Sequence, residues 1–406
     1  MSIHVVGGTY SEYCVHPEWN ELYGSGGRAA VALAEMGSSV QLHTYLGAQD
    51  LARFRGAFAL YGTRLVVDAS PTERAVRFKY VHDSAEPTIT PAILPNLPPI
   101  PLKEAKVVRF GMMEGDAVVD ADLAVYDPQS PGSPVSFGRN GSSAKRLALV
   151  LNLAEAQALL GAGVRTAEEC ARGLAAQEGA EVVVIKQGPR GALVWDKGQV
   201  GSVPAFRTES VWKIGSGDCF VAHFALCWME QGTSALEAAA TASRAVAYYC
   251  QYRSLPAATQ LQAFQPAPVK VSARYQGGAV PKVYLAGPFF DLSQIWQVDE
   301  AQRNLQDFGL DVFSPFHDVG FGHSGDVVEQ DLKALDEADM VYAIAGGADP
   351  GTIFEVGYAR AQGKPVVIYS EREAPESMKM AEGSDCRICS DYTTSLYEAL
   401  WTAVQP

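Results

Sequence analysis

Positively charged residues are scarce in this sequence. Its 406 residues include 32 Lys and Arg against 46 Asp and Glu, and the net charge is -14. A partner recognised through its phosphate backbone needs clustered Lys and Arg, so this balance argues against nucleic acid. The composition favours small ligands instead.

Long apolar runs are also missing. No segment reaches the roughly 18 uninterrupted apolar residues of a membrane span, and the opening residues, MSIHVVGG, lack the basic region of a secretory signal. The seven Cys are scattered through an acidic chain, which fits reduced thiols better than a disulfide framework. Cys386 and Cys389 form the one close pair, a weak metal candidate. The sequence therefore predicts a cytoplasmic protein with no membrane partner.

The length and the 48% hydrophobic content predict two globular domains. Residues from about 256 to 281 carry Pro and Gly without helical or strand periodicity. Within that stretch we place a linker at 266–280, between domains at 1–265 and 281–406.

The stretch DPGTIFEVGYARAQGKP, residues 349–365, places the carboxylate of Glu355 among apolar residues. Its pattern predicts a helix that opens near Gly351 and closes at Gly363, between buried strands at 340–345 and 365–369. In such a strand, helix and strand unit, ligands bind where loops leave the carboxyl ends of the strands. The alternative is a first-turn glutamate favoured only by the helix dipole.

The rest of the C-terminal part continues the alternation of strands and helices. We expect strands at 282–286 and 310–313 and helices at about 293–308 and 326–338. Together with the elements above, they predict a small doubly wound, flavodoxin or Rossmann-like parallel sheet. The segment after Tyr369 lacks clear periodicity and is expected to be a partner-facing loop or a surface excursion.

Three motifs here, VYLAGPFF, EQDLKALDEADMVYAI and DPGTIFEVGYARAQGKPVV, resemble those of the nucleoside 2-deoxyribosyltransferase family. The resemblance implies that Glu355 is the catalytic nucleophile and that Asp349 binds the sugar. It implies that Asp331 acts on the base and that Tyr284 positions Glu355, with Gly287 in the substrate loop. It also implies a homo-oligomer, at least a dimer, and no cofactor for this domain.

The chemistry supports those roles independently. An N-glycosidic bond breaks through an oxocarbenium-like state, which a carboxylate can stabilise or capture as a covalent intermediate. The departing base must gain a proton, and Asp331 is a plausible source. Either water or a second base could complete the reaction, and the sequence leaves both open.

A further expectation concerns the 5'-position of the nucleoside. Related N-hydrolases of 5'-monophosphates place small hydroxyl residues and Arg around the phosphate. This chain has Asp349 in the matching loop and no Arg in the loop 287–291. Because carboxylates would face a dianion, the sequence predicts a preference for unphosphorylated nucleosides.

In the N-terminal part, Ile214 is followed by a Gly-rich turn, Gly215, Ser216 and Gly217, and then by Asp218 at the start of a predicted helix. Such a turn presents backbone N–H groups to an anion and leaves the Asp at the entrance, which suits phosphoryl transfer. Taken alone, a tight turn without function explains the pattern equally well.

Other motifs support the functional interpretation. The segments YGSGGRAAVALAEMG (23–37), LGAQD (46–50), NLAE (152–155) and VVIKQGPRGALV (183–194) resemble, in this order, the ribokinase or PfkB family of sugar and nucleoside kinases. The resemblance implies a ribokinase-like α/β fold for this domain. It implies that Asp218 is the base that takes the proton from the acceptor hydroxyl. It implies ATP and Mg²⁺ as cofactors, with Asn152 and Glu155 in the magnesium and phosphate region.

The chain departs from that family at two places. The family's Asp-Thr before the Gly-rich turn is Trp212-Lys213, and the Asn expected in the first glycine motif is Arg28. Lys213 could bind phosphate, whereas Trp212 could fill the pocket. Glu12 lies near the family's sugar-binding Asp, with a solvated strand-end glutamate as the alternative.

The sequence thus predicts cleavage or exchange of the N-glycosidic bond of a nucleoside, coupled to a sugar or nucleoside kinase-like domain. Two alternatives stay open. The kinase-like domain could be an inactive ligand sensor, or the whole chain could be a nucleotide-binding regulatory protein without catalysis.

Overall fold

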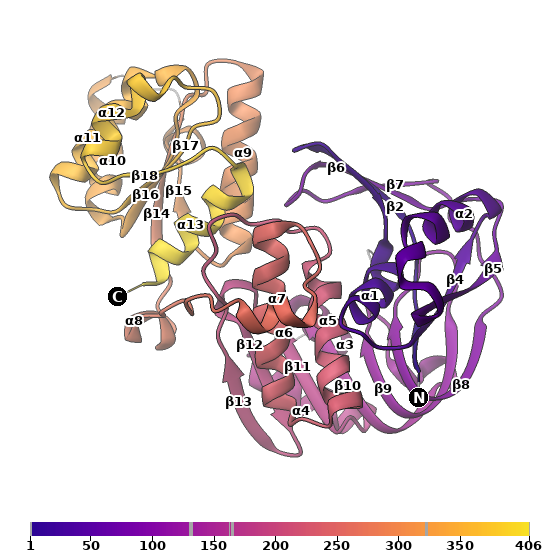
Figure 1. The fold of residues 1–406 in the computed structure, drawn as a ribbon. Helices are drawn as coiled ribbons and strands as arrows, with labels where there is room; N and C mark the ends of the chain where they lie inside the picture. Colours follow the sequence, from indigo (N-terminus) through magenta and orange to yellow (C-terminus); the bar gives the residue numbers. More distant parts are fainter. Residues whose placement is uncertain (1, 130–132, 162, 164–165, 321–323, 406) are drawn as a thin grey trace. The chain divides into compact units, whose positions relative to one another are not determined.

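The computed structural model describes residues 2–129, 133–161, 163, 166–320 and 324–405 (Figure 1). The chain forms two compact units, the first of Met1–Thr208 and Trp212–Pro268 and the second of Glu209–Val211 and Val269–Pro406. The division at Pro268 falls where the sequence predicts a linker. This stretch also carries two short helices, α7 (Ala258–Ala263) and α8 (Ala273–Gln276). No helix in the described part of the chain is long and apolar enough to cross a membrane.

A nine-stranded sheet forms the centre of the first unit. Its strands are, in spatial order, β13 (Gln199–Val203), β12 (Ala192–Asp196), β11 (Val182–Lys186), β10 (Ser143–Asn152), β9 (Ala117–Asp127), β8 (Ile100–Phe110), β1 (Ile3–Val6), β4 (Val40–Leu46) and β5 (Leu65–Pro71). Neighbouring strands run parallel except at β12, which is antiparallel to both β11 and β13. The chain leaves β1 toward β4 and returns on the other side to β8, so the strand order reverses between β1 and β8.

Helices cover both faces of this sheet, because successive residues of its buried strands point to opposite sides. Val182 and Val184 of β11 pack in the cluster that contains helices α1 (Gly24–Glu35), α5 (Ser216–Ala225) and α6 (Ala235–Tyr252). Val183 and Ile185 pack in the cluster that contains α4 (Ala167–Glu178), next to α3 (Leu153–Leu160). Helix α2 (Ala48–Ala57) follows β4. The first unit thus has three layers, and the α/β class that the sequence predicts for it is confirmed.

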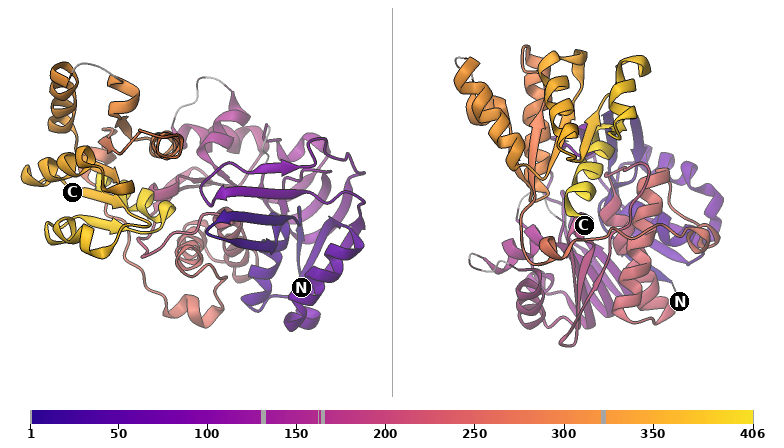
Figure 2. Two further views of the ribbon diagram at one scale, coloured as in Figure 1. Left: turned by 90° about the horizontal axis from the view of Figure 1, so that it is seen from above. Right: turned by 90° about the vertical axis from the view of Figure 1, so that its left-hand side faces the viewer.

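A second, four-stranded sheet of the first unit carries one wall of its main cavity. Its spatial order is β3 (Trp19–Leu22), β2 (Ser11–His16), β6 (Arg77–His82) and β7 (Thr88–Thr90), and Figure 2 shows it beside the larger sheet. Strand β6 alternates exposed residues with the half-buried Phe78 and Tyr80. The same alternation puts both rings on one face of this small sheet.

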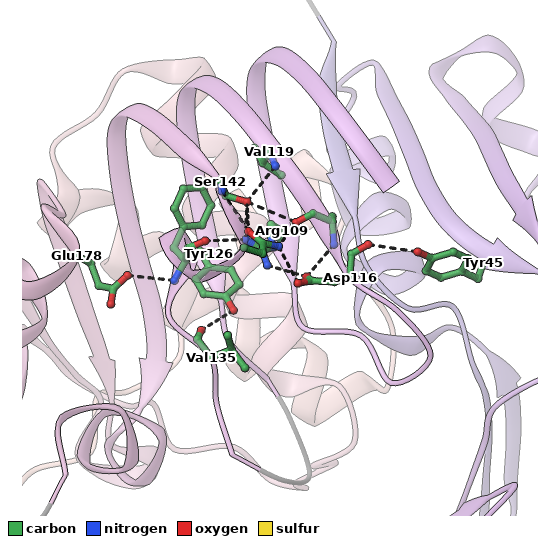
Figure 3. Close-up of polar contacts among 11 residues, drawn as sticks. Tyr45, Arg109, Asp116, Val119, Tyr126, Val135, Ser142 and Glu178 are labelled. Atoms are coloured by element: carbon green, nitrogen blue, oxygen red, sulfur yellow. Dashed lines mark hydrogen bonds and ion pairs between the residues drawn. The ribbon is translucent and has the colours of Figure 1, made fainter. Parts of the chain in front are cut away.

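A buried arginine ties strands β8 and β9 to the loops beside them (Figure 3). Arg109 donates to the carbonyl of Phe137 and the hydroxyl of Ser142, both at 3.0 Å, and to Asp116 Oδ1 at 2.7 Å. Its guanidinium carbon lies 4.8 Å from the centre of the Tyr126 ring. Since these partners belong to the framework and not to a cavity, Arg109 has a structural role.

The second unit is a five-stranded sheet in which every pair of neighbours is parallel. The order is β15 (Asp311–Phe313), β14 (Lys282–Ala286), β16 (Met340–Ile344), β17 (Val366–Tyr369) and β18 (Arg387–Cys389). Helices α9 (Leu292–Asp307) and α13 (Tyr392–Val404) pack on one face, and α10 (Ser324–Glu337), α11 (Pro350–Ala361) and α12 (Pro375–Gly383) on the other. This is the small doubly wound sheet that the sequence predicts.

The expectation of an irregular segment after Tyr369 is wrong. Helix α12, which begins with Pro375 at its first position, and strand β18 lie there. The helix buries a single residue, Met378, and the strand has three residues. Neither element is long or buried enough to leave a clear hydrophobic period in the sequence.

Candidate active sites

The first candidate site lies where the strand order of the second unit reverses. The chain goes from β14 outward to β15 and then crosses back to β16 on the other side of β14, which makes the gap beyond β14 and β16 the switch point. The loop after β14 begins at Gly287, and the loop after β16 ends at Asp349, where α11 starts. An added Cβ at Gly287 would lie 3.2 Å from a methyl of Val298 and 3.3 Å from Cβ of Ile344, so glycine lets this loop pack closely.

Glu355 and Tyr284 meet at this switch point. Tyr284, on β14, donates its hydroxyl to Glu355 Oε1 at 2.6 Å. Burial raises the pKa of Glu355 to about 7, against the effect of the Tyr284 hydrogen bond, and the negative charges of Asp331 and Asp349 raise it further. The ring of Tyr284 stacks on Phe313 of the adjacent strand at 5.6 Å. Tyr284 thus contacts Glu355 directly, and its positioning role stays a prediction.

Two further carboxylates act on Glu355 electrostatically. Asp331 lies on α10, burial raises its pKa, and its Oδ1 is buried without a hydrogen-bond partner among the described residues. Asp349 is the N-cap of α11, and its Oδ2 accepts from the backbone N–H of Thr352 at 2.8 Å and from the Thr352 hydroxyl at 3.0 Å. The structure thus brings together all four polar residues predicted for this site.

The second candidate site is a cavity of about 340 Å³ in the first unit. It opens beyond β1 and β8, where the strand order of the larger sheet reverses. Apolar and aromatic side chains, among them Phe78 and Tyr80 of the small sheet, line it together with the charged groups of Glu12, Arg28 and Asp218. Glu12 is only 5% exposed, so the alternative of a solvated strand-end glutamate is wrong.

The Gly-rich turn borders this cavity and opens α5. Gly215 is the N-cap of the helix, with a left-handed φ of 80° that favours glycine, and Ser216 and Gly217 begin the first turn. Asp218 follows in that turn and is 5% exposed. The geometry places Asp218 at the mouth of a helix N-terminus, where the sequence predicts the base of a kinase.

The sequence marks Arg28 as a departure from the family pattern, but it does not reveal the partners of its side chain. Arg28 donates from Nη1 to Asp218 Oδ2 at 2.6 Å and to Glu12 Oε1 at 3.3 Å, and from Nη2 to Glu12 Oε2. Burial alone would lower its pKa, but the charges of Glu12 and Asp218 hold it well above the ordinary value. In the sequence, Arg28 is the single cation in the run of small and apolar residues 24–34. A lone cation in such a run indicates a buried partner of opposite charge.

A second ion pair lies next to the turn. Lys186 donates to Asp127 Oδ2 at 2.7 Å, and burial raises the pKa of Asp127 to about 7 despite that lysine. Gln129 donates to Asp218 Oδ1 at 2.8 Å and accepts from the Ser25 hydroxyl at 2.5 Å. Sequence reasoning did not single out any of these side chains, because ordinary polar residues carry no motif of their own.

The remaining predicted residues of the first unit have structural partners. Asn152 and Glu155 form a reciprocal capping box at the start of α3, with 2.8 Å hydrogen bonds in both directions. The capping box accounts for the spacing of Asn152 and Glu155 in the sequence. Their role in binding a metal ion stays a prediction. No cluster of three or more potential metal ligands occurs among the described residues.

Trp212 does not fill the cavity, contrary to one of the two expectations. It is 1% exposed and packs in an apolar cluster beside Trp19, whose ring centre lies 5.2 Å away. It is also absent from the cavity lining. Lys213 has an exposed side chain, and its backbone N–H donates to Asp83 at 2.9 Å. The phosphate-binding role of Lys213 stays a prediction.

Models of two different protein families match the N-terminal and the C-terminal part of the chain. The model of the nucleoside 2-deoxyribosyltransferase family matches residues 283–386, and that of the pfkB family of carbohydrate kinases matches residues 144–259. A putative 2'-deoxynucleoside 5'-phosphate N-hydrolase 1 from Thermofilum pendens is 34% identical over 104 residues, which cover 24% of this chain and 73% of that protein. The chain belongs to the nucleoside 2-deoxyribosyltransferase family through its C-terminal part, and residues 144–259 are similar to the pfkB family of carbohydrate kinases.

Two solved structures align with part of this chain. A phosphofructokinase-2 mutant from Escherichia coli has a TM-score of 0.49 at 16% identity, over 64% of this chain and 98% of that one. A ribokinase from Thermotoga maritima has a TM-score of 0.46 at 18% identity, over 65% of this chain and 99% of that one.

Proposed function

We propose that the second unit cleaves the N-glycosidic bond of a nucleoside or deoxynucleoside with Glu355 as the nucleophile. The observation that carries this proposal is the 2.6 Å hydrogen bond from Tyr284 to Glu355 at the switch point of the sheet. A buried tyrosine that fixes one carboxylate oxygen leaves the other oriented toward the space where substrates bind in such sheets. The two neighbouring carboxylates have the other roles, Asp331 acting on the leaving base and Asp349 binding the sugar.

The proposed reaction has two steps. An oxygen of Glu355 forms a bond to the anomeric carbon while the bond to the base breaks, and the released electron pair stays on the base nitrogen. Asp331, whose pKa is raised by burial, donates the proton that the base needs. Water or the nitrogen of a second base then attacks the anomeric carbon and frees Glu355, which gives hydrolysis or exchange.

A nucleoside panel tests this function. The full-length chain is incubated with ribonucleosides and deoxynucleosides, with and without a second free base, and the products are separated by chromatography. The proposal requires release of free base, and formation of a new nucleoside would identify transfer. A panel that yields neither product would instead support the non-catalytic, regulatory alternative.

The pH dependence follows from the pKa of Glu355. Only the ionised carboxylate can attack, so kcat/KM is expected to rise with pH through a midpoint near 7. The Tyr284 hydrogen bond lowers this pKa. Tyr284→Phe removes that bond, so the midpoint should move upward by about one pH unit, the size of a hydrogen bond to a charged group. Measuring kcat/KM between pH 5 and 9 checks both values.

A matched control for Tyr284→Phe is available on the neighbouring strand. Tyr342 of β16 is equally buried, but its hydroxyl bonds with that of Ser395 at 2.7 Å. Tyr342→Phe should therefore leave the midpoint unchanged. An identical shift in both variants would mean that the effect comes from general loosening of the sheet and not from the contact with Glu355.

Asp349 provides the basis for a substrate preference. The curated relative is named for action on a 5'-phosphate, but the switch point of this chain has the carboxylate of Asp349 at the start of α11. We expect a higher kcat/KM for a deoxynucleoside than for its 5'-monophosphate. Repulsion between the Asp349 carboxylate and the phosphate at contact distance should make the ratio of these two kcat/KM values about tenfold to several hundredfold.

Asp349→Ser should reduce that ratio, because serine keeps the helix cap and removes the negative charge. Asp391→Ser is the control, since Asp391 caps α13 in the same way by accepting from the Thr394 N–H at 2.7 Å. A wild-type preference for the monophosphate would contradict this part of the proposal.

For the first unit, the proposal keeps two alternatives. In one, the unit phosphorylates a nucleoside or sugar with ATP and Mg²⁺, with Asp218 as the base and Asn152 and Glu155 near the metal. In the other, it binds a ligand without turnover. Adding ATP and Mg²⁺ to the nucleoside panel separates them, since only the kinase forms ADP. Assembly into at least a dimer through the second unit belongs to the same proposal.

A further inference from the structure

Arg28 is fixed at the centre of the cavity in the first unit. Its guanidinium bonds to Asp218 and Glu12 from two nitrogens, and its carbon lies 4.9 Å from the centre of the Tyr23 ring. On its other side is the Gly-rich turn, where an added Cβ at Gly215 would lie 2.2 Å from the guanidinium carbon. The side chain is 1% exposed. Arg28 is therefore part of the packed floor of the cavity.

This arrangement removes the conditions for proton abstraction by Asp218. Its Oδ2 accepts from Arg28 at 2.6 Å and its Oδ1 accepts from Gln129 at 2.8 Å, so each oxygen already has one donor and keeps only its remaining lone pair for a hydroxyl group. Moving a proton onto Asp218 would break a buried ion pair and leave the guanidinium with Glu12 alone. Breaking one side of a buried pair is strongly unfavourable. A phosphotransfer reaction would have to overcome that cost at each turnover.

We infer that the first unit binds an uncharged nucleoside in this cavity without phosphorylating it, because Arg28 holds both floor carboxylates in ion pairs. This goes beyond the proposed N-glycosidic reaction and does not depend on it. If the proposed function of the second unit holds, the kinase-like unit is also a receptor for the class of molecule on which that unit acts, and this last statement alone rests on the proposed function.

The lining of the cavity indicates the ligand. Its apolar wall includes Phe78, Tyr80, Ile89 and Met113, which suits the flat face of a base. The rings of Phe78 and Tyr80 are stacked, with centres 6.5 Å apart and an angle of 19° between their planes. The volume of about 340 Å³ is within the range of small-molecule pockets.

The floor of the cavity selects against a phosphate group. Two carboxylates, Glu12 and Asp218, surround the single guanidinium of Arg28, so no positive charge is left over for an anion. Free lone pairs of the same carboxylates can still accept hydrogen bonds from hydroxyl groups of a sugar. The cavity should thus bind a nucleoside more tightly than its 5'-monophosphate.

Calorimetric titration of the full-length chain tests the inference. The chain carries Glu355→Gln so that the second unit does not consume the ligand, and it is titrated with nucleosides and their 5'-monophosphates. Phe78→Ala, in the cavity wall, should weaken nucleoside binding by about tenfold or more. Lys79→Ala, at the next and exposed position of β6, should leave it unchanged. The difference between these variants assigns the binding to this cavity and not to the second unit.

ADP formation by the chain with intact Glu355, in the presence of ATP, Mg²⁺ and the same nucleosides, is measured in parallel. We expect ADP to form at the same rate with and without nucleoside. Nucleoside-dependent ADP formation, tighter binding of the monophosphate through the Phe78 wall, or equal binding by Phe78→Ala and Lys79→Ala would each overturn the inference. Release of free base is read separately, so a failure of the N-glycosidic reaction is distinguishable from a failure here.

Discussion

Glu355→Gln is expected to reduce release of free base by about a thousandfold or more while leaving the fold intact. The amide cannot attack the anomeric carbon, so the covalent route is lost entirely. It can still accept the hydrogen bond that Tyr284 donates to Glu355 at 2.6 Å. The measurement is the initial rate of base release at pH 8, where the wild-type carboxylate is ionised.

The same substitution should stabilise the protein at pH 8. Burial raises the pKa of Glu355 to about 7, so the folded state binds its proton more tightly than the unfolded state does. The charged carboxylate therefore lowers the free energy of unfolding. This effect is absent below about pH 4, grows between about pH 4 and 7, and has its full size above about pH 7. Removing the charge should raise the free energy of unfolding by about 1–3 kcal/mol at pH 8.

Glu382→Gln on α12 is the control for both measurements, because Glu382 is exposed. It should change neither the rate nor the stability. A Glu355→Gln rate within about tenfold of the wild type would remove Glu355 as the nucleophile. Equal stability of this variant and the wild type at pH 8 would show that the carboxylate is well solvated.

Arg28→Ala should lower the free energy of unfolding by about 3–5 kcal/mol at pH 8, the usual cost of leaving buried charges without a counterion. Glu12 and Asp218 are each 5% exposed and both bond to this guanidinium. Without Arg28, these carboxylates can gain protons as the pH falls, which relieves the cost. The deficit should therefore shrink between pH 8 and pH 5, as measured by denaturant unfolding.

Arg77→Ala provides the comparison, since Arg77 is an exposed residue of β6. A surface substitution of this kind should change stability by no more than about 0.5 kcal/mol. A deficit for Arg28→Ala that is equally small, or that does not depend on pH, would mean that the three charged groups do not form the ion-pair cluster described above.

Much of the C-terminal site could be predicted from the sequence, because its residues lie in ordered motifs around long, strongly patterned elements. The strand that carries Tyr284 and the helix that carries Glu355 were placed to within one or two residues. What the sequence could not provide is the hydrogen bond between these two side chains, which depends on the order of β14 and β16 in the sheet. Helix α12 was missed because it buries only Met378.

The N-terminal site was harder to predict, because its decisive contact joins residues far apart in the chain. Arg28 and Asp218 are 190 positions apart, and Glu12 comes from a third segment. The sequence identified Arg28 as a departure from the family pattern but could not reveal what it bonds to. It also suggested Trp212 as an obstruction, whereas the structure buries that ring in an apolar cluster and leaves it out of the cavity lining.

The central claim is that Glu355 forms a covalent bond to the sugar, and peptide mass spectrometry tests it most directly. The full-length chain is mixed with a deoxynucleoside, denatured in acid within the first turnovers and digested. We predict that the peptide containing Glu355 gains the mass of one deoxyribosyl group, and that this adduct is absent in Glu355→Gln. Base release at an undiminished rate in Glu355→Gln, with no adduct on the wild-type peptide, would contradict the account.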